Sequence, residues 1–212
     1  MPAIDPAELP PREVYHLLTA VVVPRPIAWV STLDPHGIRN LAPHSYFNAL
    51  SNDPPIVHFT SSGTRGAKDT LRNVRATGEF VVSIVSRDLA EQMNLTAADF
   101  PPEEDEFTWA GLAAADSDLV APPRVARARA ALECRVRTTL SMGNGNMVFG
   151  DVVRIHVDER VWRDGRVDPE LLEPVGRLGG SGYTTVDATT ITRMPRPSWD
   201  DVRAQHTRPS EA

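Results

Sequence analysis

The chain has 212 residues, 41% of them hydrophobic, with a formal net charge of −6 at pH 7 and a pI near 5.5. This length and apolar content suffice for one large domain, and the acidic balance argues against general nucleic-acid binding, which needs a net basic surface. The longest apolar stretch, residues 17–30, is too short to cross a membrane and is broken by Pro24 and Pro26. Because the N-terminus has no signal-peptide pattern and Cys134 is the single cysteine, we expect a cytoplasmic protein.

Segments rich in β-branched and aromatic residues, bounded by Gly, Asn, Asp or Pro, predict strands along most of the chain. A turn at DPHG follows the first strand and leads into a second extended segment. Asp164 and Gly165 mark the turn of a later short hairpin. The predicted strand segments are residues 28–33, 38–50, 55–61, 79–85, 131–140 and 147–158, and the hairpin spans 160–167.

Two helices are expected between these strands. Residues 69–77 have Asp69 as a candidate N-cap and Gly78 where the helix should end. Residues 88–98 place Leu89, Met93 and Ala97 on one face. Since strands and helices do not alternate regularly, the pattern favours a mainly β, antiparallel barrel with helical insertions over a doubly wound sheet.

The segment SSGTRGAKDT, residues 61–70, contains Lys68, the only lysine of the chain. It lies between a predicted strand and the start of a predicted helix, where unpaired backbone N–H groups favour an anion. A solvated turn whose hydroxyls cap the helix explains the same composition. A nucleotide P-loop does not fit, because Ala67 replaces the glycine before the lysine and Asp69 replaces the serine or threonine after it.

Other chemistries find little support in the sequence. The six histidines include no pair at helical i, i+4 spacing and have no companion cysteines, so we expect no metal site. Cys134 lies within a predicted strand and indicates a buried small side chain. The carboxylates of residues 101–107 indicate a solvated acidic surface. With no acid–base pair or nucleophile, we expect no catalytic side chain.

Several motifs taken together resemble the flavin reductase-like family. This FMN-binding split-barrel group includes reductase components of two-component flavin monooxygenases and flavoredoxin-like proteins. The likeness covers roughly residues 10–186. It rests on PRPIAWVST (24–32), NLAPHSYFNALS (40–51), VHFTSSGTRGAKDTLRNV (57–74), GEFVVSIV (78–85), and then DEFTWAGL, LECRV, VFGDVVRIHVD and VGRLGGSGYTTV.

The resemblance implies a six-stranded antiparallel Greek-key split β-barrel over residues 1–186, followed by a C-terminal extension, 187–212. It also implies a homodimer with FMN, or FAD, bound near the dimer interface. Position by position, it assigns Trp29, Val30, Ser31 and Thr32 to the border of the flavin; Asn40, Ala42, Pro43, His44 and Ser45 to the ring edge or ribityl hydroxyls; and Ser61, Ser62, Lys68 and Thr70 to the phosphate. Thr64 and Arg65 lie in the variable part of the loop.

The implied activity is hydride transfer from NAD(P)H to the flavin, whose reduced form would pass to an acceptor such as a monooxygenase partner. The flavin carries this chemistry, and the protein supplies position and electrostatics. Arg177 and Tyr183 could reach the open face of the flavin, although their glycine-rich segment could equally be a connector. The alternatives are a flavin-binding electron carrier or store without efficient NAD(P)H turnover, and a split-barrel relative of the pyridoxamine phosphate oxidase or deazaflavin type.

Overall fold

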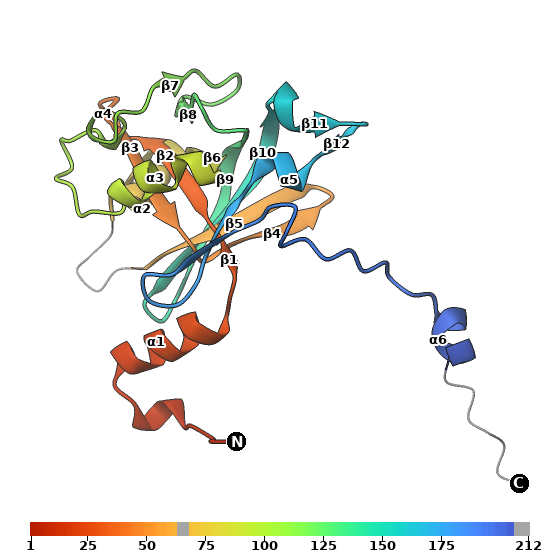
Figure 1. The fold of residues 1–212 in the computed structure, drawn as a ribbon. Helices are drawn as coiled ribbons and strands as arrows, with labels where there is room; N and C mark the ends of the chain where they lie inside the picture. The colour runs from red at the N-terminus through yellow and green to blue at the C-terminus, as the bar shows by residue number, and fades with distance from the viewer. Residues whose placement is uncertain (63–67, 206–212) are drawn as a thin grey trace, which may run out of the picture.

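In the computed structural model, which describes residues 1–62 and 68–205, the fold is built on one antiparallel sheet of seven strands (Figure 1). Its spatial order is β3 (Arg39–His44), β2 (Ala28–Leu33), β6 (Glu79–Ile84), β9 (Ala130–Met142), β10 (Gly145–Val157), β5 (Pro55–Ser62) and β4 (Phe47–Asn52). The mainly β fold with helical insertions is therefore confirmed, and β4 brings the sheet to seven strands where six were expected for the barrel.

Smaller elements surround this sheet. Three short strands form a second antiparallel sheet in the order β1 (Arg25–Pro26), β13 (Val175–Arg177) and β14 (Tyr183–Thr185). Two further pairs are β7 (Ala114–Ala115) with β8 (Arg124–Val125), and β11 (Trp162–Arg163) with β12 (Arg166–Val167). The helices are α1 (Pro11–Val21), α2 (Asp69–Thr77), α3 (Ala90–Leu95), α4 (Glu106–Trp109), α5 (Pro169–Leu172) and α6 (Trp199–Gln205), with 3-10 turns η1 (Pro6–Glu8), η2 (Arg87–Leu89) and η3 (Glu159–Val161).

The two edges of the large sheet approach each other where β3 passes into β4. The backbone N–H of Thr60 in β5 donates to the carbonyl of Tyr46, at 2.8 Å. The ring of His44, the last residue of β3, lies 4.8 Å from the ring of Phe59 in β5. These contacts curl the sheet into a partly open barrel, and the predicted site residues 40–45 lie along this junction.

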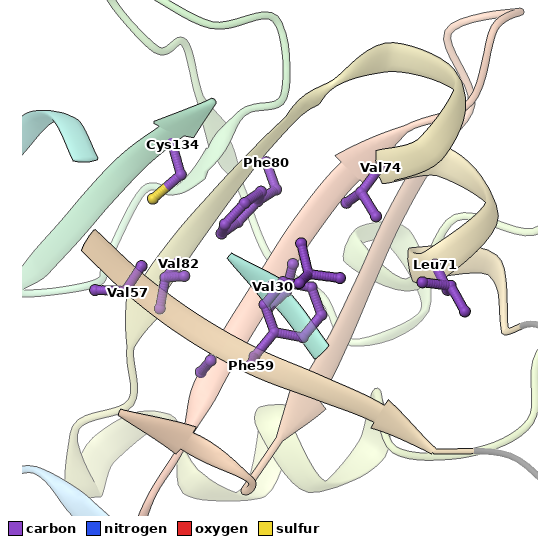
Figure 2. Packing of buried hydrophobic residues seen from close by; sticks show 10 residues of the cluster. Val30, Val57, Phe59, Leu71, Val74, Phe80, Val82 and Cys134 are labelled. Carbon is purple, nitrogen blue, oxygen red and sulfur yellow. The ribbon is translucent and has the colours of Figure 1, made fainter. Parts of the chain in front are cut away.

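The barrel interior is filled by apolar side chains that alternate along the strands (Figure 2). Val30, Phe59 and Phe80 are fully buried there, and Leu71 and Val74 of α2 pack against them. Cys134 joins the same cluster, and burial raises the pKa of its thiol, so the expected structural role of this cysteine agrees with its place in the core. The interior of the barrel is therefore closely packed with apolar side chains, and polar groups are found at the ends of the strands.

Of the two predicted helices, one is confirmed and one is shorter than expected, and α1, α4, α5 and α6 were not predicted. Helix α2 spans the predicted residues, and Gly78 ends it in the left-handed conformation at φ 74°, but the N-cap position belongs to Lys68, not to Asp69. The predicted helix 88–98 is instead the 3-10 turn η2 followed by the shorter α3. Helix α1 was not predicted, although Pro11 at its first position is a recognised start signal.

Two segments lie apart from the barrel. Helix α1 and the C-terminal stretch that ends in α6 both lie away from the large sheet (Figure 1). Among the described residues, no helix is long and apolar enough to span a membrane. The boundary expected at residue 186 follows β14, and the division of the chain there stays a prediction.

Candidate functional site

The start of α2 is the centre of the candidate site. Lys68 occupies the N-cap position in an extended conformation, and its side chain is exposed. Among the described residues no side chain caps this helix end, so the first N–H groups and the macrodipole remain directed at the space beside Lys68. Ser62, at the end of β5, is exposed, whereas Ser61 is buried. The predicted loop residues Thr64 and Arg65 lie outside the described residues.

His44 and Thr70 meet beside this helix start. The Nε2 atom of His44 lies 3.4 Å from the hydroxyl of Thr70, and both side chains are buried. Burial lowers the pKa of His44 to about 4, the nearby charge of Lys68 lowers it further, and a backbone hydrogen bond with Thr60 opposes both effects. At neutral pH the imidazole is therefore uncharged, and Lys68 supplies the positive charge beside it.

A buried hydrogen-bond network positions Asn40 behind Thr70. Thr70 Oγ1 donates to Asn40 Oδ1 at 2.9 Å, and Asn40 Nδ2 donates to Glu106 Oε1 at 2.6 Å. The other carboxylate oxygen of Glu106 accepts from the backbone N–H of Leu41 at 2.9 Å. Burial raises the pKa of Glu106 against the effect of these hydrogen bonds. The expectation of a solvated acidic loop is therefore wrong for Glu106, which is 5% exposed and supports β3.

The four residues assigned to the flavin border all have side chains that face the protein interior. Trp29 Nε1 donates to Thr96 Oγ1 at 2.9 Å, and the Ser31 hydroxyl donates to the carbonyl of Pro123. Thr32 accepts from Asn73 Nδ2 at 3.0 Å, and Val30 lies in the barrel core. Their assignment to the flavin stays a prediction, and any contact these side chains make with a ligand would require a change in this packing.

Residues 42–45 present a different environment, because Ala42, Pro43 and Ser45 are partly exposed. The Ser45 hydroxyl lies 3.5 Å from Nε of Arg25. Arg25 is 6% exposed, and its guanidinium donates to the carbonyls of Thr19 at 2.8 Å and Val22 at 2.6 Å. No ion pair found within residues 1–62 and 68–205 involves Arg25. A buried cation without a carboxylate therefore lies beside the exposed end of β3.

The C-terminal segment predicted to approach the flavin forms an ordered hairpin next to Arg25. The second terminal nitrogen of Arg25 donates to the carbonyl of Leu178 at 3.0 Å. The guanidinium of Arg177 lies 4.4 Å from the centre of the Tyr183 ring, whose hydroxyl donates to Asn94 Oδ1 at 3.1 Å. Arg177 thus lies on β13, which pairs with β1, and Tyr183 lies on β14, which pairs with β13; their contact with a ligand stays a prediction.

Arg25 is the main residue that sequence reasoning missed. Arg25 is part of the motif PRPIAWVST, on which the family resemblance rests, but nothing in the motif assigns this residue a role. Its burial depends on carbonyls from α1 and from residue 178, which is distant in the chain. A motif alone carries no information about such distant partners.

A second polar cluster, Asp118, Glu133 and His156, offers metal-ligand atoms within 4.8 Å of one another among the described residues. The buried Glu133 carboxylate already accepts from the backbone N–H groups of Asp118 and Leu119, each at 2.7 Å, and lies 2.5 Å from His156 Nε2. These contacts explain the cluster as support for the loop before β8.

Comparisons with known proteins identify the family of the chain. Residues 20–170 match the family model of the flavin reductase like domain. An uncharacterised protein of Deinococcus radiodurans is 41% identical over 210 residues, which cover 93% of this chain and 92% of that protein.

Solved structures extend the likeness. Component B of nitrilotriacetate monooxygenase from Bacillus cereus is 35% identical with a TM-score of 0.85, over 88% of this chain and 96% of that one. The 2-nitrobenzoate 2-nitroreductase of Pseudomonas fluorescens is 33% identical with a TM-score of 0.85, over 93% and 98%. A split-barrel structure from Shewanella frigidimarina, 24% identical with a TM-score of 0.79 over 90% and 96%, supports the fold.

Proposed function

Because the chain belongs to the flavin reductase-like family, we propose that it binds FMN or FAD and transfers hydride from NADH or NADPH to that flavin. The observation that carries the proposal is the start of α2, where Lys68 supplies a positive charge and no side chain of residues 1–62 or 68–205 caps the helix. Lys68 is exposed at this helix start and Ser62 is exposed at the end of β5, so both are available to a phosphate group, whereas Thr70 is buried and its hydroxyl donates to Asn40. No other lysine exists in the chain to supply such a point charge.

The side chains divide the work between the two ends of the ligand. Lys68 and the N–H groups of α2 would hold the phosphate, and His44, neutral beside them, would add no second positive charge. Backbone N–H groups of Ala42, His44 and Ser45 would face the ring edge, and buried Arg25 would favour negative charge that develops there. When bound, the flavin supplies the hydride acceptor and donor chemistry.

We also propose that the protein is a homodimer, and exposed apolar side chains support this. Tyr15, Leu18 and Val21 of α1 are 55%, 51% and 73% exposed, and Met142 at the tip of the β9–β10 hairpin is 63% exposed. Monomeric proteins rarely leave such a helix face in water. Sedimentation at micromolar concentration should give twice the mass of the chain, and a flavin-bound monomer would contradict the dimer.

The activity is tested by the visible spectrum of the purified protein before and after NADH or NADPH is added under argon. A flavin spectrum that bleaches on addition is the expected result. A flavin spectrum that does not bleach would favour an electron carrier or flavin store. A protein that binds no added flavin would overturn the proposal, and a different chromophore would indicate a related split-barrel cofactor.

The acceptor of the reduced flavin has two candidates, each named by a relative. The likeness to component B of nitrilotriacetate monooxygenase favours transfer to a separate monooxygenase partner. The likeness to a nitroreductase favours direct reduction of a nitroaromatic compound. Anaerobic turnover with NADH and 2-nitrobenzoate separates them, because only direct reduction consumes the nitro compound without a second protein. We expect this chemistry in the cytoplasm.

A further inference from the structure

A cleft of about 370 Å³ lies on the side of α2 opposite the barrel core. Its walls come from the β2–β3 turn, from the exposed face of α2 and from the loop before α4, with Ile38, Ala76 and Pro101 as apolar contacts. Asn40 and Glu106, both buried, contribute polar groups to its lining. This size and mixture of apolar walls with a few polar groups is typical of sites for small organic ligands.

The cleft begins where the proposed phosphate site ends. Asp69 and Arg72 in the first turns of α2 line it, and Asp69 directly follows Lys68. Asn40 lines the cleft as well, and its Oδ1 atom accepts the hydrogen bond from Thr70. A ligand that extends beyond a phosphate held at Lys68 therefore has this cleft as its neighbouring space.

The carboxylates that line the cleft favour a ligand group that is uncharged and donates hydrogen bonds. Glu104 and Glu106 line it, and the Glu104 carboxylate is held in place by the indole N–H of Trp109 at 2.7 Å. Arg72 pairs with Asp69 at the end of the cleft nearest to Lys68. Carboxylates accept from ribose hydroxyls and amino groups but repel phosphate, so a nucleoside fits inside while phosphates remain near the cations.

We infer that this cleft binds the adenosine half of FAD, so that the protein binds FAD more tightly than FMN. The inference rests on the proposed flavin site, because the cleft is reached from its phosphate end. FMN fills only the site at Lys68, residues 42–45 and Arg25. FAD carries an adenylate on the same phosphate, and only this half enters the space between α2 and residues 101–104.

The test uses equilibrium titration of the apoprotein with FAD and with FMN, in the wild type and in two variants. Ala76→Trp places a large side chain on an exposed helix position that lines the cleft. Ala126→Trp makes the same change at an exposed alanine outside it and serves as the control. We expect wild type and control to bind FAD at least about 10-fold more tightly than FMN, which corresponds to about 1.4 kcal/mol. Ala76→Trp should abolish this difference and leave FMN affinity unchanged.

Four results would overturn the inference. Equal affinity of the wild type for FAD and FMN would be compatible with the proposed flavin site and would contradict an adenosine site in the cleft. Unchanged FAD preference in Ala76→Trp would place the adenosine elsewhere. An increased Michaelis constant for NADH in Ala76→Trp, with both flavin affinities unchanged, would assign the cleft to the adenosine of the nicotinamide nucleotide. If neither flavin binds to the wild type, the proposed function and the inference both fail.

Discussion

Replacement of Lys68 by alanine tests the phosphate site most directly. Lys68 is exposed at the N-cap of α2, and its charge acts on the buried His44, so the ammonium lies close to the proposed phosphate position. A hydrogen bond to a charged group contributes about 1.5–3 kcal/mol. Since about 1.4 kcal/mol is tenfold in affinity, Lys68→Ala should weaken FMN binding about 10-fold to 150-fold.

The assay compares FMN with riboflavin, which lacks the phosphate. Lys68→Ala should leave riboflavin affinity about equal to that of wild type. Arg75→Ala is the matched control, because Arg75 is exposed on the same helix and lies about 10 Å along the helix axis from Lys68. The control should change FMN affinity little. Lys68→Arg should recover only part of the loss, since the planar guanidinium needs a wider approach than the ammonium.

Salt concentration gives a second check on the same contact. Lys68 is exposed, so mobile ions at high salt should screen its charge and reduce the difference between wild type and Lys68→Ala. An equal loss of FMN and riboflavin affinity in Lys68→Ala would refute the reasoning. Lys68 would then support the fold of the segment before α2, and the reading of residues 61–70 as an anion site would be wrong.

Three further predictions follow from buried groups. The pKa of His44 falls from 6.5 to about 4 in the fold, so the folded state binds fewer protons than the unfolded state between these pH values. In urea unfolding at each pH, wild type should therefore lose about 3 kcal/mol of folding stability from pH 6.5 to 4, and His44→Gln should not show this loss. Gly150→Ala should lower the free energy of unfolding by about 1–3 kcal/mol in thermal unfolding, because a Cβ atom there would lie 2.4 Å from Cζ of Phe80. An unchanged stability would mean that the Phe80 ring moves aside at no cost. Arg25→Gln should cost at least about 1.5–3 kcal/mol and expose α1 to proteolysis, since carbonyls of Thr19 and Val22 lose their donor; an unchanged cleavage pattern would contradict this role.

Most strands of the large sheet were predictable because their pattern reports burial directly, but the segment expected over residues 38–50 is two strands, β3 and β4, at the two edges of the sheet. Along β5, buried Val57, Phe59 and Ser61 alternate with less buried residues, and this period of two is visible in the sequence. The end of α2 was equally clear, because Gly78 adopts the positive φ that favours glycine. Local chemistry determines both features, so no knowledge of distant contacts is needed.

The errors arise where local signals compete or are weak. Helix α1 begins with Pro11 and exposes Tyr15, Leu18 and Val21, so its apolar residues do not form the inward face that identifies an ordinary surface helix. The segment 88–98 shows helical spacing, yet a 3-10 turn at residues 87–89 takes its first part and α3 ends at Leu95. Propensity indicates a helical segment there, and tertiary packing decides its length.

For the site, the sequence identifies the polar groups near one strand end and helix start but not those brought from elsewhere. Lys68 and Thr70 are neighbours in sequence, and the family resemblance adds Asn40 and His44. The hydrogen bond between Thr70 and Asn40 agrees with that grouping. Glu106, which supports Asn40 from 66 residues away, has no local signal that separates it from the exposed carboxylates around it. Long-range partners of this kind appear only once the fold is known.

The two cations of the site differ in burial, and this difference divides their roles. Lys68 is exposed beside His44, whereas Arg25 is 6% exposed beside Ser45, so positive charge lies at both ends of residues 44–45. Salt screens the exposed charge and hardly affects the buried one. The exposed cation therefore suits capture and release of a ligand's phosphate, which must exchange with water. In the proposed function, the buried cation would act as a constant field on the ring end, where negative charge would develop on reduction of the flavin. If the phosphate and the ring occupy these two ends as proposed, an exposed cation at the phosphate and a buried cation at the ring would suit a reductase that releases its reduced flavin to another protein.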